Sequence, residues 1–273
     1  MARWLDAEGT SHPRAAAQPR IVSLVPSVTE LLCGLGLREQ LVGRTGFCIH
    51  PKESLREVPK VGGTKDVDIA AIRALNPTHV VVNIDENRLE DAVLLREFVP
   101  AVIVTHPLGP EDNLPLYALL GGVFDREESA ARLSGALLSK LERLRGAPPG
   151  PPQRVLYLIW REPWMSVARE TYISRMLSLF AWHTEPAMSA ERYPSVRLED
   201  YAGRVDRVLL SSEPYPFRER HLAEIAQALP GVPVTLIDGE MTSWYGSRAI
   251  AALDYLEVYT RAAAPAALPE ACA

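Results

Sequence analysis

Cysteine, basic charge and long apolar runs are all scarce in this sequence of 273 residues. The three cysteines, Cys33, Cys48 and Cys272, are widely spaced and odd in number, which argues against the disulfide framework of a secreted protein. Lys and Arg number 29 against 34 Asp and Glu, so a basic face for nucleic acid is not expected. No stretch approaches the ~20 apolar residues of a membrane-spanning helix, so membrane insertion is not expected either.

The N-terminal stretch MARWLDAEGTSHPRAAAQPR is polar and rich in Ala and Pro. It lacks the apolar segment of roughly seven to fifteen residues that a secretory signal requires. We therefore expect residues 1–19 and 263–273 to be flexible tails, and the protein to be cytoplasmic with its thiols reduced. The periplasm is the alternative location if the start is misassigned.

Apolar strands alternate with helical segments along the chain. The predicted strands that matter most here cover 20–27, 78–83, 101–105, 154–159, 206–212 and 233–238. Strands this apolar, separated by helices, are typical of a parallel sheet covered on both faces. After the first strand, Ser27 is placed to cap a helix, with Glu30 completing a capping box.

One long helix is predicted over 126–147. An apolar stripe with helical spacing supports it and consists of Leu133, Leu137, Leu141 and Leu144. The stretch GAPPGPPQ, rich in Pro and Gly, then ends the helix. The predicted fold class is α/β, with two parallel-sheet lobes, 20–125 and 152–262, bridged by this single helix.

This plan resembles the class III periplasmic binding proteins, also called helical backbone metal receptors. The resemblance covers roughly residues 20–259 and rests on RIVSLVPSVTELLCGLGL, VPKVGGTKDVDIAAIRALNPTHVVV, the long helix and SWYGSRAIAAL. Members carry cobalamin, haem or ferric siderophores to ABC importers, and the cobalamin-binding branch is the most similar. The resemblance implies a ligand cleft between the lobes, where the carboxyl ends of their strands meet.

Aromatic side chains follow several of the predicted strands. Trp160 and Trp164 flank an Arg-Glu-Pro turn after the strand at 154–159, and a rigid aromatic wall suits a planar chelate. The alternative is that each tryptophan caps the core at the strand end. By loop position or by the family pattern, the further candidates for the cleft are Phe47, Tyr193, Trp244 and Tyr245.

Cys48 and His50 lie beside Phe47 and are the candidate metal ligands. Thiolates and imidazoles suit soft and borderline metals, and His50 could take an axial position on a corrinoid cobalt or a haem iron. Alternatively, Cys48 is a small buried residue and His50 a hydrogen-bonded one. A zinc site is not expected, because no second Cys/His pair exists; His79 and His106 are interpreted as structural or surface residues.

The VGGTKD loop adds Thr64 and Lys65 to the candidate ligand contacts. Its glycine pair allows close backbone approach, and Lys65 could meet an anionic group, although the spacing is not that of a phosphate-binding P-loop. Cobalamin binders carry a tryptophan where this chain has Thr64.

The resemblance also implies a docking residue. Importer-bound members present one acidic residue on each lobe to arginines of the membrane subunit. Glu199 matches the position on the second lobe, whereas the first lobe has Ala70 there, with Asp68 two residues away.

Together these observations predict a non-enzymatic binding protein for a metal chelate, a corrinoid such as cobalamin or a haem- or siderophore-type ligand. No cofactor is required, and no nucleic acid partner is expected. One alternative is a substrate-binding component of an ABC importer with a missing signal. Another is a cleft enzyme that uses Cys48 and His50 as a thiolate–imidazole pair.

Overall fold

The computed structural model describes residues 3–147 and 150–263. The chain forms two compact units: unit 1 contains Met1–Ser139 and Trp244–Ile250, and unit 2 contains Lys140–Ser243 and Ala251–Ala273. Each unit is built on a mainly parallel sheet with helices, which confirms the predicted α/β fold class. No helix within the described residues is both long and apolar enough to cross a membrane.

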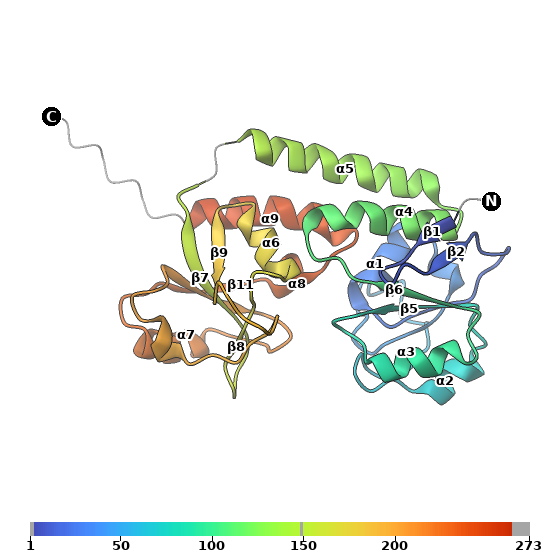
Figure 1. Ribbon diagram of the computed structural model, residues 1–273, viewed down its shortest axis with the longest axis horizontal. Coiled ribbons are helices and arrows are strands. Elements are labelled where there is room, and N and C mark those ends of the chain that lie inside the picture. Colours follow the sequence, from blue (N-terminus) through green and yellow to red (C-terminus); the bar gives the residue numbers. More distant parts are fainter. Residues whose placement is uncertain (1–2, 148–149, 264–273) are drawn as a thin grey trace. The chain divides into compact units, whose positions relative to one another are not determined.

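Unit 1 contains a four-stranded parallel sheet in the order β4-β3-β5-β6. Its strands are β3 (Ile21–Ser23), β4 (Leu41–Arg44), β5 (His79–Asn83) and β6 (Ala101–Thr105). Figure 1 shows α2 (Ile69–Ala74) and α3 (Leu89–Arg96) on one face of the sheet, and α1 (Pro26–Gly34) and α4 (Asn113–Val123) on the other. Both faces are therefore covered, which is why most residues of these strands are apolar and polar residues stand only at strand ends.

The start of α1 differs from the predicted capping box. Pro26 stands at the beginning of the helix, where its missing N–H costs no hydrogen bond, so Ser27 lies inside the helix. The Glu30 carboxylate instead accepts two hydrogen bonds of 2.8 Å from Nε and Nη2 of Arg248. The predicted box was wrong because the true partner of Glu30 is 218 residues away in sequence.

Residues 3–13 form an antiparallel hairpin, and the prediction of a flexible tail over 1–19 is wrong for them. The strands are β1 (Arg3–Leu5) and β2 (Ser11–Pro13). The buried Asp6 carboxylate accepts hydrogen bonds from Glu8 N at 3.0 Å, Thr10 N at 2.9 Å and His12 Nε2 at 3.0 Å. A fourth bond, of 3.2 Å, comes from Val104 N of β6 and ties the hairpin to the sheet edge.

The hairpin also packs on α4. The Trp4 indole lies against Gly122, where an added Cβ would fall 1.9 Å from the ring, so only glycine fits there. Ala7 N donates to Val104 O at 2.9 Å, which extends the pairing at the edge of β6. The other predicted tail, 263–273, lies outside the described residues except for Ala263.

Unit 2 contains a five-stranded sheet. Strands β7 (Gln153–Trp160), β9 (Trp182–Glu185), β10 (Arg207–Ser211) and β11 (Val234–Ile237) are parallel, and the short β8 (Met165–Ser166) is antiparallel to β7. The helices that belong wholly to this unit after β7 are α6 (Tyr172–Ser178), α7 (Arg220–Ala228) and α8 (Gly239–Ser243). The aliphatic run of β7 is buried, and it ends at the exposed Trp160.

The long predicted helix is present as α5 (Glu127–Gly146). Leu137 and Leu141 are buried, and Leu133 and Leu144 are half-buried, as expected for one apolar stripe. The division between the units falls inside α5, after Ser139, and again inside α9 (Arg248–Ala262), after Ile250. The prediction from the sequence instead makes 126–147 a separate spacer between the lobes.

Candidate functional site

The loop after β4 is organised by a buried arginine. The Arg44 guanidinium donates hydrogen bonds to the carbonyl oxygens of Leu55 at 3.2 Å, Thr45 at 3.1 Å and Cys48 at 3.0 Å. Phe47 lies within this loop, and its side chain is 61% exposed. The buried arginine therefore fixes the loop and leaves a large aromatic side chain at the carboxyl edge of the unit 1 sheet.

The predicted VGGTKD loop lies against this aromatic residue. Gly46 N donates to Gly62 O at 2.8 Å, and a Cβ on Gly63 would lie 3.2 Å from the Phe47 ring. Thr64 is half-buried, and its carbonyl accepts a 3.1 Å hydrogen bond from Asn87. The structure thus brings two of the predicted ligand loops together within unit 1.

Lys65 is exposed, and its ammonium group donates to the carbonyl oxygen of Asp85 at 2.8 Å. Asp85 follows β5, and its carboxylate lies 3.5 Å from Nε2 of His106, which follows β6. The sequence interpretation left Asp85 out and placed His106 among structural or surface residues. Their position directly after two apolar strands is the signal that could have identified them.

Cys48 does not lie where a metal ligand would. It is fully buried, and its sulfur contacts the hydroxyls of Thr29 at 3.0 Å and Thr45 at 3.1 Å. Burial raises the pKa of this thiol, which works against formation of a thiolate. The alternative of a thiolate–imidazole pair with His50 gains no support, because Cys48 turns into the core while the His50 ring packs edge-on against Trp244, with ring centres 5.4 Å apart.

We expect both described thiols to react slowly with Ellman's reagent. Burial is the main cause that raises the pKa of Cys33 from 9.0 to about 11. In a Cys272→Ser variant, the labelling rate of Cys33 should therefore rise about tenfold per pH unit below that pKa, because only the thiolate reacts. Rapid labelling at neutral pH, compared with the same chain unfolded in urea, would contradict this expectation.

Trp244 and Tyr245 belong to unit 1, although they lie between two segments of unit 2 in the sequence. The Arg248 guanidinium lies 4.7 Å from the centre of the Trp244 ring, and Glu30 holds that guanidinium in place. Trp244 is only 7% exposed. The residue therefore offers less surface to a ligand than the sequence predicts.

Tyr245 is equally enclosed. Its hydroxyl donates a 2.6 Å hydrogen bond to Oε1 of Glu86, which follows β5. Burial first, and then the Glu86 carboxylate, raise the pKa of Tyr245 well above its usual value, so the phenol stays protonated. Glu86 is a second residue that the sequence interpretation missed.

In unit 2 the two tryptophans of the Arg-Glu-Pro turn differ in exposure. Trp160 is 41% exposed at the end of β7 and contacts Tyr215 edge-on, with ring centres 5.7 Å apart. Trp164 is half-buried, lies parallel to Phe217 at 6.1 Å, and packs on the core of the unit. The alternative of a core cap therefore describes Trp164, whereas Trp160 is the exposed aromatic residue and the half-buried Tyr215 supports it.

The remaining predicted residues of unit 2 lie farther along the chain. Tyr193 is half-buried in a segment that runs beside β8, where Ser166 N donates to Pro194 O at 3.0 Å. Glu199 is exposed in a short 3-10 helix. In unit 1, by contrast, the Asp68 carboxylate accepts a 2.8 Å hydrogen bond from Ala71 N and caps α2.

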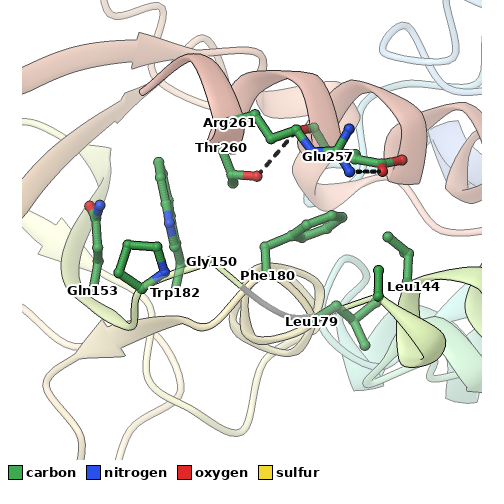
Figure 2. Close-up of a pocket in the computed structure, with 11 residues that line it drawn as sticks. Leu144, Gly150, Gln153, Leu179, Phe180, Trp182, Glu257, Thr260 and Arg261 are labelled. Atoms are coloured by element: carbon green, nitrogen blue, oxygen red, sulfur yellow. Dashed lines mark hydrogen bonds and ion pairs between the residues drawn. The ribbon is translucent and has the colours of Figure 1, made fainter. Parts of the chain in front are cut away.

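A hollow of about 200 Å³ opens at the amino edge of the unit 2 sheet (Figure 2). Gln153 and Trp182, the first residues of β7 and β9, line it together with residues of α9. On the α9 side, Arg261 pairs with Glu257 at 2.7 Å. Of the described residues that line this hollow, none is a predicted ligand residue, so it is not part of the candidate site.

The positions of the His, Cys, Asp and Glu side chains also bear on whether the protein could bind a metal ion directly. Within residues 3–147 and 150–263, no three His, Cys, Asp or Glu side chains come together as a metal site. A metal that arrives inside a chelate needs at most an axial ligand from the protein, and His50 is the candidate for it.

The chain is a two-unit α/β protein with an exposed aromatic side chain at the carboxyl edge of each sheet. The family described as periplasmic binding protein matches residues 21–191, which is more than half of the chain. The chain belongs to this family. The predicted resemblance to the class III members is thereby confirmed, and the similarity includes the cobalamin-binding branch.

Individual relatives are distant in sequence. The vitamin B12-binding protein of Vibrio parahaemolyticus is 23% identical over 194 residues, which cover 71% of this chain and 70% of the relative. The structure of the periplasmic vitamin B12 binding protein BtuF of Vibrio cholerae has a TM-score of 0.75 and 20% identity, covering 90% of this chain and 97% of that one. The structure of the periplasmic heme binding protein HutB of Vibrio cholerae has a TM-score of 0.71 and 20% identity, covering 89% of this chain and 99% of that one.

These structural similarities show that the chain shares the fold of both proteins. The family and the relatives are binding proteins rather than enzymes, in agreement with the prediction made from the sequence. The prediction that no cofactor is required is consistent with them as well.

Proposed function

We propose that the chain is a non-enzymatic binding protein for a metal chelate, with a corrinoid of the cobalamin type as the first candidate. The observation that carries this proposal is the 23% identity to a vitamin B12-binding protein over 71% of the chain. Haem is the second candidate chelate, because a heme binding protein shares the fold over 89% of the chain.

The aromatic edges support the proposal. Phe47 in unit 1 and Trp160 in unit 2 are the two predicted site residues with large exposed aromatic surfaces. Each offers a flat apolar face at little cost in side-chain entropy, which suits a macrocycle. We assign both as ligand contacts, with Thr64, Lys65 and Tyr193 as further proposed contacts.

Trp244 and Tyr245 have a supporting role in this proposal. Arg248 and Glu86 hold them in place, and Trp244 packs against His50 in the loop that carries the exposed Phe47. Lys65, whose ammonium group is exposed, is the contact that suits a phosphate or propionate on the edge of a chelate.

An absorption spectrum of the protein purified from its own host tests the proposal most simply. Corrinoids and haem absorb visible light, whereas the polypeptide does not. A corrinoid or haem band that co-elutes with the protein supports the proposal. A colourless protein that also fails to take up either chelate when both are added would refute it.

We expect His50→Ala to weaken binding of a haem by on the order of tenfold more than binding of the metal-free porphyrin, if the imidazole reaches the metal. The metal-free porphyrin controls for the loss of packing against Trp244. His183→Ala, at an exposed position of β9, is the matched control variant. Equal losses for both porphyrins would remove His50 as an axial ligand and leave it a packing residue.

Docking to an ABC importer is the second candidate function. The structural relatives include an ABC transporter substrate-binding protein from Listeria monocytogenes, with a TM-score of 0.72 and 19% identity over 88% of this chain and 97% of that one. Glu199 is exposed and available for such a contact, while Ala70 occupies the corresponding position of unit 1. A pull-down with a candidate membrane subunit, repeated with Glu199→Gln, tests this role.

The relatives also bear on the location of the protein. The relatives BtuF and HutB are periplasmic, so they give the predicted cytoplasmic location no support, whereas the alternative in the periplasm fits them. Fractionation of the native host distinguishes the two locations directly.

A further inference from the structure

The His50 imidazole is half-buried in the loop that follows β4. Arg44 holds the backbone of this loop, because its guanidinium donates hydrogen bonds to the carbonyl oxygens of Thr45 at 3.1 Å and Cys48 at 3.0 Å. The His50 ring itself packs edge-on against Trp244, with ring centres 5.4 Å apart and an angle of 71° between the planes. The orientation of the imidazole therefore depends on where the Trp244 ring lies.

The backbone beside Trp244 is fixed by α4. Gly246 N donates a 2.5 Å hydrogen bond to Oδ1 of Asn113, and the Tyr117 hydroxyl donates a 2.8 Å bond to the Gly246 carbonyl oxygen. Asn113 and Tyr117 are fully buried. Neither bond involves the side chain of Trp244 or Arg248, so we expect the segment to keep its place when the contacts of those side chains change.

The face of the Trp244 ring is covered by a guanidinium that Glu30 holds. The Arg248 guanidinium carbon lies 4.7 Å from the ring centre, within the range of a cation–π contact. Nε and Nη2 of Arg248 each donate a 2.8 Å hydrogen bond to the Glu30 carboxylate. A bidentate pair fixes the plane of the guanidinium as well as its position. Both side chains are partly buried, so water and salt screen this pair less than an exposed one.

We propose that Glu30 is a positioning residue for the chelate site. Through Arg248 and Trp244 it sets the orientation of the His50 imidazole toward the metal, an inference that rests on the proposed function and on His50 as the axial ligand. Without the Glu30 carboxylate, the guanidinium leaves the ring face, the Trp244 ring gains rotational freedom, and the imidazole loses the wall against which it packs. Metal ligation needs a defined bond direction, whereas the apolar contact of a macrocycle with Phe47 does not.

The first test uses the full chain without ligand and follows the NMR signal of the His50 ring, assigned by its absence in His50→Ala. The ring current of the neighbouring Trp244 displaces this signal from the position of an unpacked histidine. We expect Glu30→Gln to move the signal toward that position. Glu128→Gln, which removes an exposed 2.7 Å ion pair with Arg132 in the same unit, is the matched control and should leave it unchanged. A His50 signal that is the same in Glu30→Gln and in the parent would overturn the inference.

The second test compares the binding of haem with that of metal-free protoporphyrin, followed by absorption and electron paramagnetic resonance. We expect the parent to bind haem with the spectrum of an imidazole-ligated iron. Glu30→Gln should weaken haem binding by up to about tenfold and reduce this spectrum, because residues that orient a metal ligand contribute on this scale. Imidazole added to the variant should restore the spectrum. Binding of the metal-free porphyrin should change by less than about twofold, as for a substitution remote from the ligand. Equal losses for both porphyrins would mean that the ion pair only stabilises the fold, and would overturn the inference.

The two tests separate this inference from the proposed function. A parent chain that takes up neither haem nor a corrinoid refutes the proposed function and leaves Glu30 a structural residue. A parent chain that binds a chelate with the same axial spectrum in Glu30→Gln retains the proposed function and overturns the inference. If the parent binds only corrinoids, diaquocobinamide takes the place of haem, and dicyanocobinamide, whose two axial positions are filled, takes the place of the metal-free porphyrin.

Discussion

Replacing Trp160 by Ala is expected to weaken corrinoid binding by about 1–3 kcal/mol, the scale for loss of an aromatic anchor. Trp160 is 41% exposed at the carboxyl end of β7, and its ring is braced edge-on by Tyr215. An exposed ring held in a fixed orientation can stack on a ligand without first losing rotational freedom. The measurement is an equilibrium titration with cyanocobalamin, followed by absorbance or calorimetry.

Control variants test whether the loss of binding is specific to the exposed aromatic side chains. Phe47→Ala should weaken binding in the same direction, because it removes the exposed aromatic side chain of unit 1. Val258→Ala in unit 2 and Leu89→Ala in unit 1 remove exposed apolar side chains elsewhere and should leave binding unchanged. If Trp160→Ala and Phe47→Ala both bind like the parent, the aromatic edges are not ligand contacts.

Asp6→Ala should lower the free energy of unfolding of unit 1 by about 3 kcal/mol. The change removes one buried carboxylate that accepts four hydrogen bonds and leaves the His12 imidazole and Val104 N without their acceptor. Urea denaturation, followed by tryptophan fluorescence, measures the loss.

Glu90→Gln, an exposed acidic residue of α3, is the matched control and should change stability by less than about 0.5 kcal/mol. A loss for Asp6→Ala no larger than that of the control would mean that the hairpin adds little to the fold. Retention of chelate binding by a folded Asp6→Ala protein is expected, because the hairpin lies at the edge of β6 and away from Phe47.

Most of the fold could be predicted from the sequence, because apolar strands and the apolar stripes of helices are local patterns. The helix predicted over 126–147 is observed as Glu127–Gly146, and the apolar run after Arg154 is a buried strand. The hairpin at 3–13 was missed for a physical reason. Its stability depends on Asp6, whose fourth donor, Val104 N, lies 98 residues away in the sequence.

The candidate site could be predicted only in part, because contacts between residues distant in the sequence decide which side chains are exposed. Phe47 and Trp160 are exposed, and their role as ligand contacts stays a prediction. Trp164 was placed by its turn, but Phe217, 53 positions later, is what draws it onto the core. Cys48 was grouped with His50 by spacing alone, whereas Thr29 and Thr45 determine which way its thiol turns.

The central claim is that this chain binds a metal chelate, and a titration of the full parent chain with cyanocobalamin and with haem tests it most directly. The account predicts saturable one-to-one binding of at least one of them, with quenching of tryptophan fluorescence that is reduced in Trp160→Ala. Titrations that produce neither saturable heat nor quenching with either chelate, on protein shown to be folded, would contradict it.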